Sequence, residues 1–436
     1  MRPVAPSFAV RFGWRIVCFR DFRRRVIEEP VAMPDPADLS NSYTDTSFVS
    51  PWNAVPAAGT PLVVHDTTLR DGEQQAGIVF TPDEKLQIAS ALDEAGVNRI
   101  EAGMVAVSDD DRKAILSIVE SGPRAEIWTI ARSVSSDVQM AIDVGVNGVG
   151  IILLANSQYR MIFNLSLDEA IERAIRAAET ARAAKLQTTL LLADAPRYPI
   201  DELRHVVEQI DLSGQFTAIS LMDTFGTLNP AGTQRLIRQI REWTQIPLEL
   251  HAHNDFGLAT ANSLAAFEAG ASTIHTTVLG LGERVGNAAL EEVAVAAALL
   301  EQASTSVHLN HLSAIAHLVS RHSNHPIATN KPIVGTRISE IESGTVAVEF
   351  ARWSERGGDL QWLFPYVPEL VGADQPTLVL GKYSGMANVD WALQSSQITF
   401  PQDRKAALLS EVKAEGIRLH RTLTTADFEA ITRRLL

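Results

Sequence analysis

Cysteine is almost absent from the sequence, since Cys18 is the only one in 436 residues. A single thiol excludes a disulfide within the chain, so we expect the protein in a reducing compartment, the cytoplasm. Long apolar runs are also missing, because no stretch of about 18 uncharged apolar residues occurs, the length that a transmembrane helix needs. We therefore expect no membrane partner.

Positive charge is scarce relative to negative charge. The chain has 38 Lys and Arg against 52 Asp and Glu, which gives a formal net charge of -14 at pH 7. A chain with this balance is not expected to carry a groove for the phosphates of a nucleic acid. The expectation that remains is a small-molecule ligand, whose chemistry the net charge does not indicate.

The N-terminal 60 residues differ from the rest. Residues 1–32 are rich in arginine and aromatics, as in a transit peptide, but Asp21, Glu28 and Glu29 fit such a peptide poorly. The alternative is a disordered or mispredicted leader with Met33 as the true start. Residues 34–60 contain Pro, Asp, Ser and Asn throughout, which is typical of a loose arm.

From residue 61 onward, short aliphatic or β-branched runs alternate with amphipathic segments of helical length. One helix is expected after Thr81, where a threonine N-cap, Pro82 and early acids precede Gly96. Another is expected after Ser166, which opens a Ser-x-x-Glu capping box. The eight candidate strands lie near residues 62–66, 98–104, 126–132, 148–154, 188–194, 216–223, 247–253 and 272–280.

Eight strand–helix units over about 240 residues predict an α/β protein with a (β/α)8 TIM barrel. The alternative is an open doubly wound sheet, which usually has a glycine-rich phosphate loop after its first strand. Here the first strand is followed by TTLRDGEQQ, which has one glycine and several ionisable residues. We predict a catalytic barrel domain over residues 61–304 and a smaller, mainly helical or mixed C-terminal subdomain over residues 305–436.

The motif LELHAHND places two histidines at the end of the predicted seventh strand. Residues i and i+2 of a strand face the same side, so His251 and His253 can both point into the barrel mouth. Two neutral imidazoles and one carboxylate leave open positions on a divalent cation, as a catalytic metal site requires. We select Asp71 as the carboxylate and Asn287 as a neighbour of the open positions. The alternative is that both histidines are hydrogen-bonded residues of the core or rim.

Other polar residues are expected at the same mouth, because barrel sites form at the C-terminal ends of the strands. Arg70 can stabilise a developing oxyanion or enolate, or it can form a salt bridge that holds its loop. Thr224 can receive a substrate carboxylate or simply cap the next helix. Arg132 can clamp a carboxylate through two hydrogen bonds, or it can bridge Glu101 on the adjacent strand.

Three long motifs, DTTLRDGEQ, HAHNDFGLATAN and GLGERVGNAALEEV, occur in this order. Together they resemble the Claisen-condensing branch of the DRE-TIM metallolyase superfamily, which includes homocitrate, 2-isopropylmalate and citramalate synthases. The resemblance covers residues 62–302, and weaker echoes follow in NKPIVG and LGKYSG. It implies an enzyme that joins an acyl-CoA, usually acetyl-CoA, to the ketone carbon of a 2-oxo acid and then hydrolyses the thioester.

The resemblance also implies roles for individual residues. By motif position, Asp71, His251 and His253 bind a divalent metal (Mg²⁺, Mn²⁺ or Zn²⁺), and Arg70 stabilises developing negative charge. The residues that match the substrate-orienting positions are Gln74, Arg132 and Thr224. A homodimer is implied as well, in which the C-terminal region of one chain caps the barrel of the other.

The motifs in the C-terminal region depart from the family pattern. The family's THESGIH stretch reads SEIESGTVA here, so Ile341 and Val346 stand where two histidines are usual. Tyr383 replaces another common histidine with a phenol, which is a poor base at its ordinary pKa near 10. The altered stretch hints at a specialised 2-oxo acid, such as a phosphono or dicarboxylic one. The candidates for proton transfer, which the sequence does not rank, are His322, His325, Glu342 and Tyr383.

Two other functions stay open. Carbon–carbon lyases and aldolases share the superfamily, but acyl-CoA lyases usually need a cysteine in a glycine-rich loop near the end of the barrel. The only cysteine of this chain is Cys18. The chain can also be a metal-binding pseudoenzyme that has lost its general base. A long regulatory domain is not expected, because too few residues follow residue 400.

Overall fold

The computed structural model of the chain describes residues 49–50, 52–53, 59–356 and 363–436. The predicted leader, Cys18 and most of the predicted arm lie outside the described residues. Within these ranges, no helix is both long enough and apolar enough to cross a membrane. Residues 43–436 form one compact unit, and the domain boundary after residue 304 stays a prediction.

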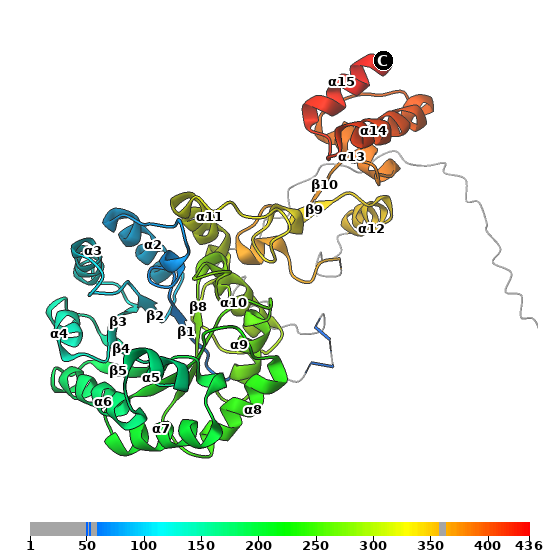
Figure 1. Cartoon of the computed structure of the whole chain (residues 1–436). Helices are drawn as coiled ribbons and strands as arrows, with labels where there is room; N and C mark the ends of the chain where they lie inside the picture. Colours follow the sequence, from blue (N-terminus) through cyan, green and yellow to red (C-terminus); the bar gives the residue numbers. More distant parts are fainter. Residues whose placement is uncertain (1–48, 51, 54–58, 357–362) are drawn as a thin grey trace, which may run out of the picture. The chain divides into compact units, whose positions relative to one another are not determined.

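Eight parallel strands form a closed barrel in sequence order. The first and last strands pair from Val63 with Thr273 to Asp66 with Thr276. Figure 1 shows the strands inside a ring of helices, as the sequence predicts, and the alternative of an open sheet is wrong. The strands are β1 Val63–Asp66, β2 Arg99–Glu101, β3 Glu126–Arg132, β4 Gly148–Leu153, β5 Gln187–Leu192, β6 Ala218–Asp223, β7 Leu248–Ala252 and β8 Thr273–Thr276.

The barrel helices begin where the sequence supplies N-caps. Thr81 and Glu84 form a capping box at the start of α2, with Pro82 as its first residue, and Ser166 and Glu169 form another at α6. These side chains satisfy amide groups that have no partner within the helix. The helices are α2 Pro82–Glu94, α3 Asp109–Glu120, α4 Ser135–Asp143, α5 Ser157–Phe163, α6 Leu167–Ala183, α7 Ile200–Ser213, α8 Pro230–Arg241, α9 Ala259–Glu268 and α10 Leu290–Leu299.

Alternate residues of each strand face opposite sides of the barrel wall. Ile151 and Leu192 belong to the main core, which includes residues of the strands and of the surrounding helices. Their neighbours Ile152 and Leu191 belong to a separate apolar cluster. Because both faces of such strands are buried, their sequences read as nearly continuous apolar runs. The inward positions of β7, β8, β1 and β2 are instead polar, and they build the site.

The part of the chain after the barrel is mainly helical, as predicted. Strands β9 and β10 form a small parallel pair, and a local apolar core includes Val389, Val412 and Phe428. Lys331, in the motif NKPIVG, pairs with Glu292 of α10. The elements are α11 Leu312–Ser323, β9 Glu340–Ile341, α12 Gly344–Glu355, β10 Thr377–Leu378, α13 Met386–Ser395, α14 Lys405–Leu419 and α15 Thr425–Leu435.

Candidate metal and substrate site

The structure brings Asp71, His251 and His253 together at the barrel mouth. Asp71 lies in the loop after β1, and the histidines come from the end of β7. Nε2 of His251 lies 3.2 Å from Oδ2 of Asp71, and Nε2 of His253 lies 3.8 Å from the same oxygen. One ligand atom from each residue lies within 4.8 Å of the others. The three side chains can therefore share one cation.

The chemistry of these donors fits a divalent metal ion. Both nitrogens of His251 and Nδ1 of His253 are buried and have no hydrogen-bond partner among the described residues. Burial lowers the pKa of His251 to about 3 and also lowers that of His253, so both imidazoles are neutral and can act as ligands. Burial alone would raise the pKa of Asp71, but Arg70 and the histidines hold it well below its usual range. Orphaned imidazole nitrogens beside a carboxylate are what a bound cation would satisfy.

Arg70 lies next to this group and is almost fully buried. Its Nη1 donates to Oδ2 of Asp71 at 2.7 Å, and its Nε donates to Glu101 of β2. Nη1 also donates to Oε1 of Gln74 at 3.3 Å, which places Gln74 at the same site. Nε2 of His65 lies 3.6 Å from the second oxygen of Glu101. The guanidinium is thus fixed in position by two carboxylates, as an electrostatic stabiliser of developing charge needs to be.

Thr224 directly follows β6, and Asn287 lies in the segment between β8 and α10, where it forms an isolated bridge with His253. Asn287 Nδ2 donates to Oδ1 of Asp71 at 3.0 Å, while Asn287 Oδ1 is buried and has no hydrogen-bond partner among the described residues. The Thr224 hydroxyl accepts a hydrogen bond from the Asp194 amide at 2.8 Å, and the Thr224 carbonyl accepts one from Arg284 at 2.6 Å. Asn287 is therefore an immediate neighbour of the candidate metal ligands.

Arg132 is placed differently from the expected bridge. It forms two hydrogen bonds with Asp137 of α4, from Nε at 2.7 Å and from Nη2 at 2.9 Å. Glu101, the partner considered from the sequence, binds Arg70 instead. Asp137 is buried whereas Arg132 is largely exposed, so the pair anchors the start of α4 to the end of β3.

Glu342 and Tyr383 form a second group, in the C-terminal region. The Tyr383 amide donates to Oε1 of Glu342 at 3.0 Å, and both residues line a cavity with Arg337, Lys382 and His420. Within the described ranges, no hydrogen bond or ion pair joins them to the three candidate ligands. Neither of the two other proton-transfer candidates reaches those ligands either, because His322 pairs with Glu84 of α2 and the His325 backbone bonds within its own turn.

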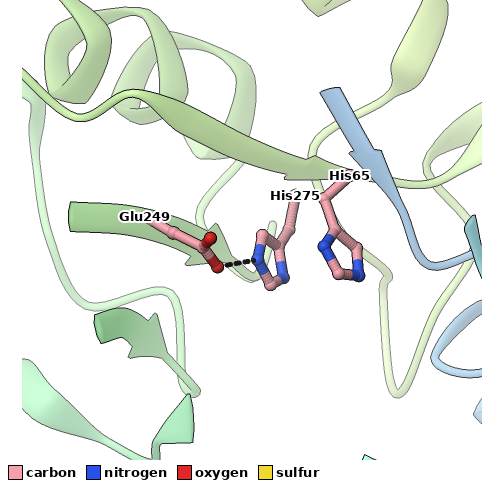
Figure 2. A group of neighbouring side chains, drawn as sticks. All are labelled: His65, Glu249 and His275. Atoms are coloured by element: carbon pink, nitrogen blue, oxygen red, sulfur yellow. Dashed lines mark hydrogen bonds and ion pairs between the residues drawn. The ribbon is translucent and has the colours of Figure 1, made fainter. Parts of the chain in front are cut away.

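A further buried group, His65, Glu249 and His275, lies deeper in the barrel (Figure 2). His275 Nε2 is 3.0 Å from Oε2 of Glu249, and Arg99 donates to the other oxygen at 2.8 Å. The rings of His65 and His275 stack with centroids 4.3 Å apart and an angle of 15° between planes. Nearly parallel rings do not direct their in-plane lone pairs to one point, and Arg99 already neutralises the carboxylate. We interpret this group as an ion-pair network that supports Glu101 from below.

The sequence reasoning missed this network, although a signal was present. Glu249 has the same strand parity as His251, and His65 is level with His275 in the β1–β8 pairing. Polar residues at inward positions of a barrel strand therefore indicated that the interior is charged on this side. Lys85 was also missed; it is buried in α2 and pairs with Glu73 at 2.6 Å and with Asp111, which holds the loop that carries Asp71.

Comparison with known proteins identifies relatives that cover most of the chain. Residues 62–319 match the family model described as HMGL-like. The chain is 34% identical over 373 residues to homocitrate synthase AksA of Methanothermobacter thermautotrophicus, covering 84% of this chain and 92% of that protein. It is 36% identical over 378 residues to 2-isopropylmalate synthase of Methanocaldococcus jannaschii, covering 85% of this chain and 71% of that protein.

A solved structure shares the fold at lower identity. The HMG-CoA lyase of Bacillus subtilis superposes with a TM-score of 0.57 at 20% identity, covering 63% of this chain and 97% of that one. At this identity the likeness concerns the barrel alone. The similarity to the two synthases extends over more of the chain, and the family model matches more than half of it, so the chain belongs to the HMGL-like family.

Proposed function

We propose that the protein is a metal-dependent enzyme that condenses an acyl-CoA, most simply acetyl-CoA, with a 2-oxo acid. Water then hydrolyses the thioester, so the products are a 2-hydroxy-2-carboxymethyl acid and CoA. The observation that carries the proposal is the buried group of Asp71, His251 and His253 with Arg70 fixed beside it. The relatives named homocitrate synthase and 2-isopropylmalate synthase support the same class of reaction.

Each residue of the mouth has a role in this proposal. Asp71, His251 and His253 hold a divalent cation (Mg²⁺, Mn²⁺ or Zn²⁺), with Asn287 beside its open positions. Such a cation would polarise the carbonyl group of the 2-oxo acid as a Lewis acid. Arg70 stabilises negative charge on that oxygen while the carbon–carbon bond forms, because a buried guanidinium acts strongly in a dry site.

Three residues are proposed to orient the 2-oxo acid. Gln74 is held against Arg70 and presents an amide to the same space. Thr224 has a hydroxyl proton to donate, since its oxygen accepts from the Asp194 amide. Arg132 uses Nε and Nη2 for Asp137 and keeps Nη1 for a carboxylate.

Proton transfer is assigned to the C-terminal region. Deprotonation of the acetyl methyl group needs a base, and Glu342 and Tyr383 are our candidates because Ile341 cannot serve. In one chain these two residues contact each other and not the candidate metal ligands. We therefore propose a homodimer in which the C-terminal region of one protomer covers the barrel mouth of its partner. A cytoplasmic location also remains part of the proposal.

The lyase alternative is less well supported. The glycine-containing loop after β8, residues 277–289, contains no cysteine, and the similarity to the lyase structures is one of fold. The synthases are matched at higher identity and over more of the chain.

The test is a thiol-detection assay of CoA release from acetyl-CoA in the presence of Mg²⁺ or Mn²⁺ and a panel of 2-oxo acids. We expect release with at least one acid, and a fall of at least about 100-fold in Asp71→Asn. The matched control, Asp168→Asn, changes an exposed carboxylate that pairs with His205 and keeps full activity. Stoichiometric metal binding without CoA release from any acid would instead establish the pseudoenzyme alternative.

A further inference from the structure

One side of the barrel interior is apolar. A group of inward-facing residues from β3, β4, β5 and β6 forms a cluster separate from the main core. Gly150 leaves space for this cluster, because a Cβ at that position would lie 2.7 Å from Cδ1 of Leu191. The apolar wall, as we name this cluster, consists of Ile130, Ile152, Leu191, Ala193 and Met222.

The apolar wall lies on the inner face of the barrel, the same face as His251. Leu191 and Met222 keep 2% and 6% of their surface exposed, whereas the outward-facing Leu192 and Leu221 keep none. Ile152 is only partly buried. This alternation follows from strand geometry, in which successive side chains point to opposite faces. Ile152 is therefore the wall residue that keeps most of its surface for contact with a ligand.

The apolar wall begins beside the candidate metal ligands. Met222 of β6 is the direct partner of His251 in the β6–β7 pairing. Ile152 is likewise the partner of both Arg132 and Leu191 in its ladders. A 2-oxo acid held beside His251, at the candidate cation site, would have this wall next to its remaining chain.

The arginines that the described residues place at this mouth are already paired with carboxylates. Arg197, for example, makes contacts of 2.6 to 2.9 Å with Asp194. Nη1 of Arg132 is assigned above to the carboxylate of the 2-oxo acid itself, so these pairs leave a second, distal carboxylate without a guanidinium of its own. The pairs are Arg70 with Asp71 and Glu101, Arg132 with Asp137, Arg160 with Glu202, Arg197 with Asp194, and Arg284 with Asp255.

The adjacent cavity offers no free cation either within the described residues. It measures about 520 Å³ and is lined by Arg70, Gln74, Met104 and Lys85, among others. The Lys85 ammonium group already has three partners, namely Glu73, Asp111 and the Leu69 carbonyl. Within the barrel of one chain, a distal anionic group would therefore lie unpaired in this space.

We propose that the substrate of this enzyme is a 2-oxo acid with an uncharged aliphatic side chain, which packs against the apolar wall. The proposal rests on the proposed function and narrows it. It replaces the phosphono or dicarboxylic acid suggested by the SEIESGTVA stretch. Burying an unpaired anion is costly, so we expect discrimination against a distal carboxylate of at least about 100-fold.

The test has a binding arm and a turnover arm. The Mn²⁺-loaded full-length protein is titrated calorimetrically with 2-oxoisovalerate, 2-oxobutyrate, 2-oxoglutarate and phosphonopyruvate, and CoA release is measured with each acid. Ile152→Arg adds a cation to the wall. It should reduce the preference for aliphatic 2-oxo acids over those with a distal anionic group by at least about 10-fold. Leu212→Arg, at a residue of α7 that is 78% exposed, is the matched control and should leave the preference unchanged.

The outcomes separate this proposal from the proposed function. Tighter binding of the aliphatic acids without any CoA release would refute condensation but support the substrate class. CoA release with 2-oxoglutarate or phosphonopyruvate as the better substrate would refute the substrate class and support condensation. If Ile152→Arg and Leu212→Arg showed the same preference for aliphatic over anionic 2-oxo acids, the apolar wall would not determine the substrate class. The wild-type ratio needs no variant, so misfolding of Ile152→Arg does not remove the test.

Discussion

Replacing Glu101 with glutamine tests the buried electrostatics of the site most directly. Glu101 is 1% exposed, accepts from Nε of Arg70 and lies beside His65. Burial alone would raise its pKa, but Arg70 and His65 outweigh burial and lower the pKa from 4.5 to about 2. A fall of this size corresponds to about 3 kcal/mol of folding free energy at neutral pH. Glutamine keeps the shape and an acceptor oxygen while removing the charge.

We therefore expect Glu101→Gln to lower the free energy of unfolding by about 3 kcal/mol at pH 7, near the lower end for breaking a buried pair. The effect has a defined pH dependence. A depressed carboxyl pKa stabilises the fold above the unfolded pKa, and this stabilisation is lost as pH falls toward the folded pKa. The difference between wild type and variant should thus shrink by roughly 0.8 kcal/mol between pH 7 and pH 4.

The assay is urea unfolding followed by circular dichroism at both pH values. Glu208→Gln is the control, since Glu208 forms an exposed pair with Arg204 on α7 and should change stability by less than about 0.5 kcal/mol. A loss in Glu101→Gln no larger than in the control, or a loss that grows toward pH 4, would refute the reasoning.

Three further predictions concern the metal, the acid–base balance and the packing of the interior. His251→Ala should weaken Mn²⁺ binding by at least about 100-fold in equilibrium dialysis while the far-ultraviolet spectrum stays native; unchanged affinity would exclude His251 as a ligand. Burial and the adjacent Glu268 raise the pKa of Glu301 to about 7, so its ionisation destabilises the fold as pH rises from 4.5 through 7. Glu301→Gln should therefore gain stability over wild type with rising pH, in thermal unfolding at pH 5 and pH 8; a gain confined to pH 5 would contradict this sign. Gly150→Ala should lower stability by about 1–3 kcal/mol, seen in the same melts, because its Cβ would meet Leu191 at 2.7 Å; an unchanged melt would show that Leu191 moves away freely.

The barrel and the meeting of the three candidate metal ligands could be predicted because each depends on a short-range rule. Strand parity places His251 and His253 on one side, and the C-terminal ends of all the strands meet at one mouth, which brings in Asp71. The capping boxes at Thr81 and Ser166 are likewise local, and the structure has both.

The partners of the arginines could not be predicted in this way. Whether Arg132 binds Glu101 or Asp137 depends on how α4 packs against β3, and that is set by the whole barrel. The placement of Glu342 and Tyr383 depends on a region with short strands and little periodicity. The sequence alone does not predict the apolar wall, because inward and outward residues of a strand buried on both faces are equally apolar.

Asp71 follows the first strand, whereas the two histidines end the seventh, so the cation site spans the seam where the eighth strand joins the ends of the barrel. These side chains come together only when the barrel has closed. The rate of metal uptake during refolding should therefore report the rate of barrel closure. An ion at 100 times its dissociation constant would add about 2.7 kcal/mol to the closed form. The cation would thus link the two ends of the barrel. Removing it with a chelator should destabilise the first and last strands before the others.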